Sequence, residues 1–293
     1  MDLDLSVLDD LADAADVAFL VEMDHFVHEK YDFRLLCIRY LASRGWRIFG
    51  EEIDHRVGER TDAYLRTGQE SYLEPIEEPD WYTSGILTKA KRIPEYDTEQ
   101  ARFATVVREA VPDARWFGFD VGADDTDYLD LANAANTYDE LGPAMALRER
   151  SMHERVDAVL AGGERVALMA GSTHLLKHDI DASPAGPGGG AVPSIGHHVA
   201  ETRSVFSIWM LNGSGRTSSP WVSELQPQPG TLNAELAMRY DEPVLVLPES
   251  DTSMRITQMH NIVLECNLHE QVDAIVFVPE VTPLIGTSRS PNR

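Results

Sequence analysis

The residues best suited to chemistry lie just after an apolar run near the start of the sequence. Glu22 and His25 follow the run 17–21 directly. A carboxylate and an imidazole placed in this way can form a general-base pair. The carboxylate orients the ring and stabilises its protonated form, while the other ring nitrogen takes a proton from water. The alternative is that the acidic group only stabilises the start of the next helix through the helix dipole, and the pair by itself does not separate the two.

The same arrangement recurs further along the chain. Three more apolar runs end in an acidic residue or a histidine: 46–49 before Glu51 and Glu52, 114–121 at Asp120, and 165–170 before His174. Because successive side chains of a strand point to opposite faces, only one of Glu51 and Glu52 should face a common site, and the sequence leaves open which one. Four strands with such ends are more than helix capping alone would produce. The repetition favours a catalytic or metal site over a plain binding module.

Arg34 lies nine residues beyond His25, on a segment whose apolar residues recur at helical spacing. This separation is about two and a half helical turns, so both residues can face one site only if His25 stands in the loop before the helix. In that place Arg34 would bind a carbonyl, carboxylate or oxyanion of the substrate. The bare sequence favours the simpler alternative of an ordinary surface arginine.

Strands and helices are expected to alternate along the chain. Runs of strand type occupy 17–21, 46–49, 114–121, 165–170, 204–211, 244–247 and 273–279, and helical segments occupy 29–43, 98–111 and 143–160. This alternation predicts an α/β fold with a mostly parallel central sheet flanked by helices. Ligands of such sheets bind outside the carboxyl ends of the strands. Glu22, His25 and one of the two adjacent glutamates should therefore converge on one crevice.

A single domain is expected to cover residues 1–287, since 293 residues are enough for one large α/β domain. The polar segment 55–95 predicts a helical insertion or lid near the site. The segment 181–193 is rich in glycine and proline and cannot bury a core, so it is expected to be a flexible loop. Residues 288–293 are expected to form a disordered tail.

The composition limits the possible partners. The chain has 25 Lys and Arg against 49 Asp and Glu, a formal net charge of −24. Nucleic acid and anionic membranes need a basic face, so neither is expected as a partner. Two cysteines, Cys37 and Cys266, give no disulfide framework and no zinc pattern, and the sequence shows neither a secretory signal nor a membrane helix. We therefore expect a cytoplasmic protein with a small-molecule substrate, and a homodimer if the chain forms an oligomer.

Several short motifs resemble, in their order and spacing, those of the erythromycin esterase-like family. They are Glu22-Met-Asp-His25, Arg34, Gly45-Trp46 to Glu52, Phe117-Gly-Phe-Asp120, Arg148 to Met152, and Ala167 to His174. That family belongs to a wider superfamily with ChaN-like haem-uptake proteins and the TraB and Tiki proteins. Two positions depart from the pattern. Val21 stands where the family usually has glycine, and Gly171 takes the place of the first histidine of a His-Asn-x-His pattern.

The resemblance implies a role for each of these residues. His25 would be the general base that activates water, with Glu22 and Glu52 as its carboxylate partners. His174 would be a second histidine across the crevice. The expected substrate-binding residues are Arg34, Asp120 and Arg148.

The predicted function is hydrolysis of an ester, lactone or amide of a small molecule, natural products included, or a related biosynthetic acid/base reaction. It would use histidine-activated water, without a covalent intermediate or a cofactor. The first alternative is a zinc or manganese hydrolase at the same site, with ligands drawn from Glu22, His25, Glu52, Asp120 and His174. The second alternative is a haem- or ligand-binding protein of the ChaN-like kind, which would need an axial ligand in an apolar pocket. The missing Gly-x-Ser-x-Gly elbow argues against a serine nucleophile.

Overall fold

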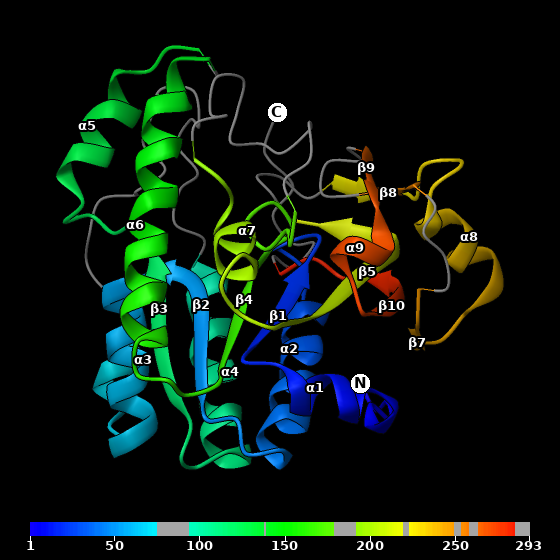
Figure 1. Ribbon diagram of the computed structural model, residues 1–293, viewed down its shortest axis with the longest axis horizontal. Helices are drawn as coiled ribbons and strands as arrows, with labels where there is room; N and C mark the ends of the chain where they lie inside the picture. Colours follow the sequence, from blue (N-terminus) through cyan, green and yellow to red (C-terminus); the bar gives the residue numbers. More distant parts are fainter. Residues whose placement is uncertain are drawn as a thin grey trace.

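A central sheet organises the molecule (Figure 1). The computed structural model describes residues 1–74, 94–137, 139–178, 192–218, 223–248, 253–257 and 263–284. Within them, the sheet has the order β3-β2-β4-β1-β5-β10-β7, with β6 paired to β5, and β8 and β9 form a separate pair. The strands are β1 (Val17–Glu22), β2 (Ile48–Asp54), β3 (Arg115–Asp120), β4 (Val166–Gly171), β5 (Val205–Thr217), β6 (Ser223–Leu225), β7 (Val244–Val246), β8 (Ser253–Thr257), β9 (Val263–Asn267) and β10 (Ala274–Val281).

The strands from β3 to β10 in this order run parallel, whereas β6 and β7 pair antiparallel with β5 and β10. All six residues of β1 are buried, and so are all six of β4. Such continuous apolar runs are typical of parallel strands that are covered on both faces. The predicted α/β fold with a mostly parallel, helix-flanked sheet is confirmed.

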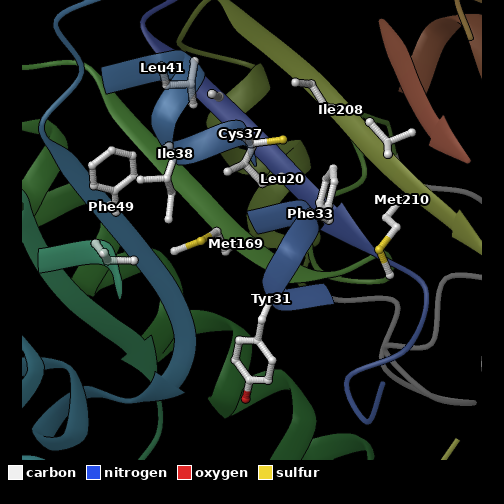
Figure 2. Close-up of a cluster of buried hydrophobic side chains, with 14 of the residues drawn as sticks. Leu20, Tyr31, Phe33, Cys37, Ile38, Leu41, Phe49, Met169, Ile208 and Met210 are labelled. Atoms are coloured by element: carbon white, nitrogen blue, oxygen red, sulfur yellow. The ribbon is translucent and has the colours of Figure 1, made fainter. Parts of the chain in front are cut away.

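Helices α1 to α4 contribute to the core on one face of the sheet. Phe33, Cys37 and Ile38 of α2 belong to the same buried cluster as Leu20 of β1 and Phe49 of β2 (Figure 2). Their spacing along the helix puts all three on one side, which is the side that the sheet covers. The bounds of these helices are α1 (Asp9–Ala14), α2 (Glu29–Ser43), α3 (His55–Thr67) and α4 (Pro94–Ala110).

The opposite face is covered mainly by α6. Met152 and Val156 of this helix pack in a second buried cluster with Phe19 of β1 and Trp209 of β5. The remaining helices are α5 (Thr126–Ala134), α6 (Gly142–Leu160), α7 (Ile195–Ala200), α8 (Leu232–Arg239) and α9 (Leu268–Gln271), and short 3-10 turns occupy Ser6–Leu8, Glu70–Leu73 and Asp139–Leu141. In the described part of the chain, no helix is both long and apolar enough to cross a membrane.

The connections after β1 and β4 diverge at the carboxyl edge of the sheet. The two strands are neighbours, and Glu22 of β1 is level with Gly171 of β4. The chain leaves β1 towards α2 on the first face and leaves β4 towards α7 on the second. In α/β proteins, ligands bind where adjacent strands have opposite exits, and we call this place at the carboxyl ends of β1 and β4 the crevice.

The loop after β1 is anchored by a segment from the other end of the chain. We call residues 24–28 the site loop and residues 282–284 the C-terminal strap. Two backbone hydrogen bonds join them, His28 N to Thr282 O at 3.0 Å and Leu284 N to Phe26 O at 3.2 Å, and together they form the antiparallel bridge between Val27 and Pro283. These contacts fix the path of the loop that carries His25.

Some expected bounds differ from those observed. Glu51 and Glu52 were expected to close the second strand after the run 46–49, but β2 extends from Ile48 to Asp54, two residues beyond Glu52. Helix α3, in the expected insertion 55–95, packs against β3 and is therefore a flanking helix. Residues 75–93, 181–191 and the tail 288–293 lie outside the described residues.

Candidate active site

His25 and Glu22 form a hydrogen-bonded pair at the carboxyl end of β1. Glu22 is the last residue of the strand, and its Oε1 lies 2.9 Å from Nδ1 of His25 in the site loop. The Glu22 side chain is fully buried, whereas that of His25 is 29% exposed. The second ring nitrogen, Nε2, lies 3.8 Å from Oε2 of Glu52. The pair thus has one nitrogen fixed by a carboxylate and an accessible ring.

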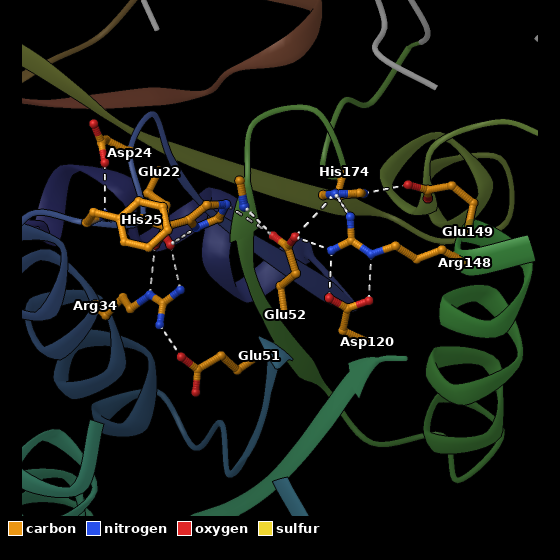
Figure 3. Close-up of polar contacts among 12 residues, drawn as sticks. Glu22, Asp24, His25, Arg34, Glu51, Glu52, Asp120, Arg148, Glu149 and His174 are labelled. Atoms are coloured by element: carbon orange, nitrogen blue, oxygen red, sulfur yellow. Dashed lines mark hydrogen bonds and ion pairs between the residues drawn. The ribbon is translucent and has the colours of Figure 1, made fainter. Parts of the chain in front are cut away.

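Arg34 of α2 forms an ion pair with Glu22 on the side away from the crevice (Figure 3). Its Nε and Nη2 donate to the two oxygens of Glu22 at 2.8 and 2.7 Å, and its Nη1 pairs with Glu51. The other oxygen of Glu51 accepts a hydrogen bond from Gln100 at 2.6 Å. Arg34 is 1% exposed and Glu51 is 0% exposed. Both residues therefore support Glu22 from inside the protein, and the choice between the adjacent glutamates falls on Glu52 for the crevice.

Glu52 lies between the two histidines. Its Oε2 accepts the backbone N–H of Gly171 at 2.9 Å, and its Oε1 accepts from Arg148 Nη2 at 2.7 Å. Oε1 is also 3.2 Å from Nε2 of His174. β2 and β4 are hydrogen-bonded neighbours, and this adjacency brings Glu52 level with the loop that follows β4.

A second arginine supports the far side of the crevice. Arg148 of α6 binds both oxygens of Asp120, at 2.7 and 2.6 Å. This bidentate geometry is the strong form of an arginine–carboxylate pair. Asp120 is completely buried, and Arg148 is 9% exposed.

His174 is enclosed by two carboxylates. Its Nδ1 lies 2.5 Å from Oε1 of Glu149, and its Nε2 faces Glu52. Nη1 of Arg148 also lies 3.2 Å from Nε2. Two flanking carboxylates favour an imidazolium that donates from both nitrogens.

These surroundings shift several pKa values. Burial opposes ionisation of Glu22, but Arg34 and the hydrogen bond from His25 outweigh it and lower its pKa to about 2. Burial also works against the charged form of His174, yet Glu52 and Glu149 raise its pKa to about 10. In Glu52, the charges of His174 and His25 overcome burial and hold the pKa well below the ordinary value. At neutral pH, the crevice therefore contains carboxylates and a histidine cation in fixed positions.

Gly171 leaves room for the His25 ring. A Cβ on Gly171 would lie 2.9 Å from Nε2 and 3.0 Å from Cε1 of His25. Real Cβ contacts are essentially never so short, so a side chain here requires the imidazole to move. The glycine noted as a departure from the family pattern thus permits the present position of His25.

The predicted residues assemble as one group, with two qualifications. Glu22, His25, Glu52 and His174 meet at the crevice, joined by Arg148. The expected substrate contacts of Arg34 and Asp120 do not fit their burial, because neither exposes more than 1% of its surface. We infer that these two residues orient other side chains.

Sequence reasoning missed Glu149 and Lys30. Glu149 follows Arg148 on α6, where an acidic residue is ordinary, so only the fold reveals its contact with His174. Lys30 is completely buried, with Arg34, Glu22 and Glu51 as charged neighbours. Burial, assisted by Arg34, lowers its pKa to about 8. Its position one residue into α2 resembles that of any surface lysine in the sequence.

A cluster of possible metal ligands lies among the described side chains. Asp54, His55 and Asp124 are the group whose ligand atoms lie within 4.8 Å of one another. Those atoms are already engaged: His55 lies 3.1 Å from Asp124, and Arg56 pairs with Asp54. The acidic residues of the crevice form ion pairs with arginines and with the histidines.

Comparisons with known proteins give the fold. No family model and no curated protein matches the sequence. Three solved structures are similar over most of the chain. A Bacillus cereus protein has a TM-score of 0.67 at 13% identity, covering 95% of this chain and 92% of that one. A succinoglycan biosynthesis protein has a TM-score of 0.68 at 13% identity, covering 95% and 91%. An erythromycin esterase mutant in its open conformation has a TM-score of 0.67 at 16% identity, covering 99% and 97%.

At such identities the likeness shows a shared fold. That fold is the parallel sheet flanked by helices described above. Membership of the erythromycin esterase-like family stays a prediction.

Proposed function

We propose that the chain is a hydrolase that acts on an ester, lactone or amide of a small molecule, with His25 as general base. The observation that carries the proposal is the Glu22–His25 pair, a buried carboxylate 2.9 Å from one nitrogen of a partly exposed imidazole. Glu22 fixes the tautomer with the proton on Nδ1, which leaves Nε2 to accept a proton. The erythromycin esterase among the similar structures makes this reaction class a natural one to test.

The chemistry requires water, a carbonyl and two proton transfers. Nε2 of His25 takes a proton as the water oxygen attacks the carbonyl carbon, and Glu22 stabilises the imidazolium that forms. The tetrahedral oxyanion then collapses, the bond to the leaving alcohol or amine breaks, and His25 returns the proton to that group. The cations of His174 and Arg148 supply positive charge on the far side of the crevice, where an oxyanion would be stabilised.

The test is hydrolysis of a panel of p-nitrophenyl esters, lactones and anilides. We expect His25→Asn to lower kcat/KM by about 10² to 10⁴, the usual contribution of a general base, with little change in Tm. His269→Asn is the matched control, because His269 is exposed on α9. A wild-type protein inactive on the whole panel, or a His25→Asn variant with full activity, would rule the proposal out.

The zinc or manganese alternative is tested on the same sample. Elemental analysis after dialysis and activity with and without a chelator separate the two mechanisms. Stoichiometric metal together with activity lost to the chelator would replace general-base chemistry by metal-activated water. A Soret band after addition of haem tests the haem-binding alternative.

A further inference from the structure

Two histidines share the crevice, but their surroundings differ. His25 contacts one carboxylate at hydrogen-bond distance, through Nδ1, and its side chain is 29% exposed. His174 has a carboxylate on each nitrogen, and its side chain is 8% exposed. Two histidines in different surroundings can take different roles in acid/base chemistry. Each ring has a carboxylate on Nδ1, Glu22 for His25 and Glu149 for His174. The surroundings differ because His174 is more buried and because Glu52 lies 3.2 Å from its Nε2 but 3.8 Å from Nε2 of His25.

Glu149 is itself held in place. Its Oε1 lies 2.5 Å from Nδ1 of His174, and its Oε2 accepts the backbone N–H of Ile195, the first residue of α7, at 3.2 Å. Glu149 is 5% exposed. His174 and Arg148, which face it most closely, hold the pKa of its carboxyl below the ordinary value despite burial. Glu149 therefore stays ionised at neutral pH and presents a fixed negative charge to Nδ1.

We propose that Glu149 is a positioning residue that keeps His174 protonated on both nitrogens and aims its Nε2–H at Glu52 and the crevice (Figure 3). In this arrangement His174 acts as a permanent cation, and His25 remains the group that exchanges protons. The catalytic roles of the two histidines rest on the proposed function, but the protonation state of His174 does not.

The other charges around His174 oppose or support this state. Arg148 is a neighbouring cation and disfavours a protonated ring, as burial does. Glu52 from β2 and Glu149 from α6 favour it. His153, one turn along α6, contributes to lowering the pKa of Glu149. Without the Glu149 carboxylate, only Glu52 would favour the protonated ring, while Arg148 and burial would still disfavour it. The pKa of His174 should therefore fall.

The experiment is a pH titration of the histidine side chains by ¹⁵N NMR in wild type, Glu149→Gln and Glu154→Gln. The His174 signals are assigned by their loss in His174→Gln. Glu154 lies on the same helix and is exposed, so Glu154→Gln makes the same charge change away from the ring. We expect the wild-type His174 midpoint to lie above about pH 8 and to fall by about one pH unit or more in Glu149→Gln, while Glu154→Gln leaves it unchanged.

A wild-type midpoint below about pH 8, or equal midpoints in wild type and Glu149→Gln, overturns the proposal. Should Glu149→Gln not fold, Glu149→Asp keeps the charge at a shorter reach, and the wild-type midpoint still decides. The pH profile of kcat/KM is a second readout, in which Glu149→Gln should lose activity at a lower pH than wild type on the alkaline side. A shifted NMR midpoint in a protein without hydrolase activity would support the role of Glu149 and reject the proposed function.

Discussion

Glu52 connects two buried ion-pair groups that would otherwise be separate. One is centred on Arg34 with Glu22 and Glu51, and the other on Arg148 with Asp120. Removing one member of such a group leaves an uncompensated buried charge, which costs more than the pair contributes. Single substitutions here change stability as well as activity, so each activity measurement needs a stability measurement beside it.

Gly171→Ala tests the space around His25 without removing a charge. We expect kcat to fall about tenfold to a hundredfold, because the new Cβ displaces the imidazole and catalysis is sensitive to shifts of about 1 Å. Steady-state kinetics with a panel ester and a melting curve measure the two effects. Gly162→Ala, where a Cβ would lie 3.2 Å from Val159 O, is the control. Unchanged kcat in Gly171→Ala would contradict the fixed position of His25.

Glu22 should contribute to stability in a particular pH range. Its pKa is about 2 in the folded protein against an ordinary 4.5, so its contribution is present above pH 4.5 and is lost as the pH falls towards 2. Between pH 5 and 3, the free energy of unfolding of the wild type should fall by about 2 kcal/mol more than that of Glu22→Gln. Urea unfolding at a series of pH values measures the difference. Parallel curves for the two proteins would show that Arg34 does not depress this pKa.

At the scale of elements, α2 was predicted with the bounds that it has, 29–43, because its apolar spacing is local information. β2 was predicted to close with Glu51 and Glu52, whereas it extends to Asp54 and buries both glutamate side chains. Their burial is permitted by Arg34 and Arg148, and Arg148 lies 96 residues beyond Glu52. The partners that make an acidic strand possible are long-range facts, which local patterns do not contain. The same reason explains why Glu149 was missed.

The contact of α3 with β3 depends on glycine. A Cβ on Gly58 would lie 1.8 Å from the backbone nitrogen of Gly118, so the helix backbone approaches the strand directly. We expect Gly58→Ala to destabilise the fold by about 3 kcal/mol, the upper part of the usual cost of overpacking. Thermal unfolding measures it, with Gly162→Ala again as the control. A Tm equal to that of wild type would mean that α3 can shift without cost.

At the scale of the whole molecule, the net charge of −24 dominates. Self-repulsion of this size destabilises a folded chain, and salt screens it. We therefore expect the Tm to rise as NaCl increases from about 0.05 to 0.5 M, where the Debye length falls well below 10 Å. KCl should act equally, because the effect is one of screening. A Tm that falls with both salts would show that the buried ion pairs, rather than surface repulsion, control the salt response.

The C-terminal strap also sets an order of events during synthesis. The site loop at 24–28 emerges from the ribosome early, but residues 282–284, which fix its path, are translated more than 250 positions later. β10, which lies between β5 and β7 in the sheet, is equally late. Contacts between distant parts of a chain form slowly, and domains of this size commonly fold through intermediates. A nascent chain can thus bury much of its sheet while the site loop still lacks its contacts with the C-terminal strap, and the final position of His25 would be reached only after residues 282–284 have been added.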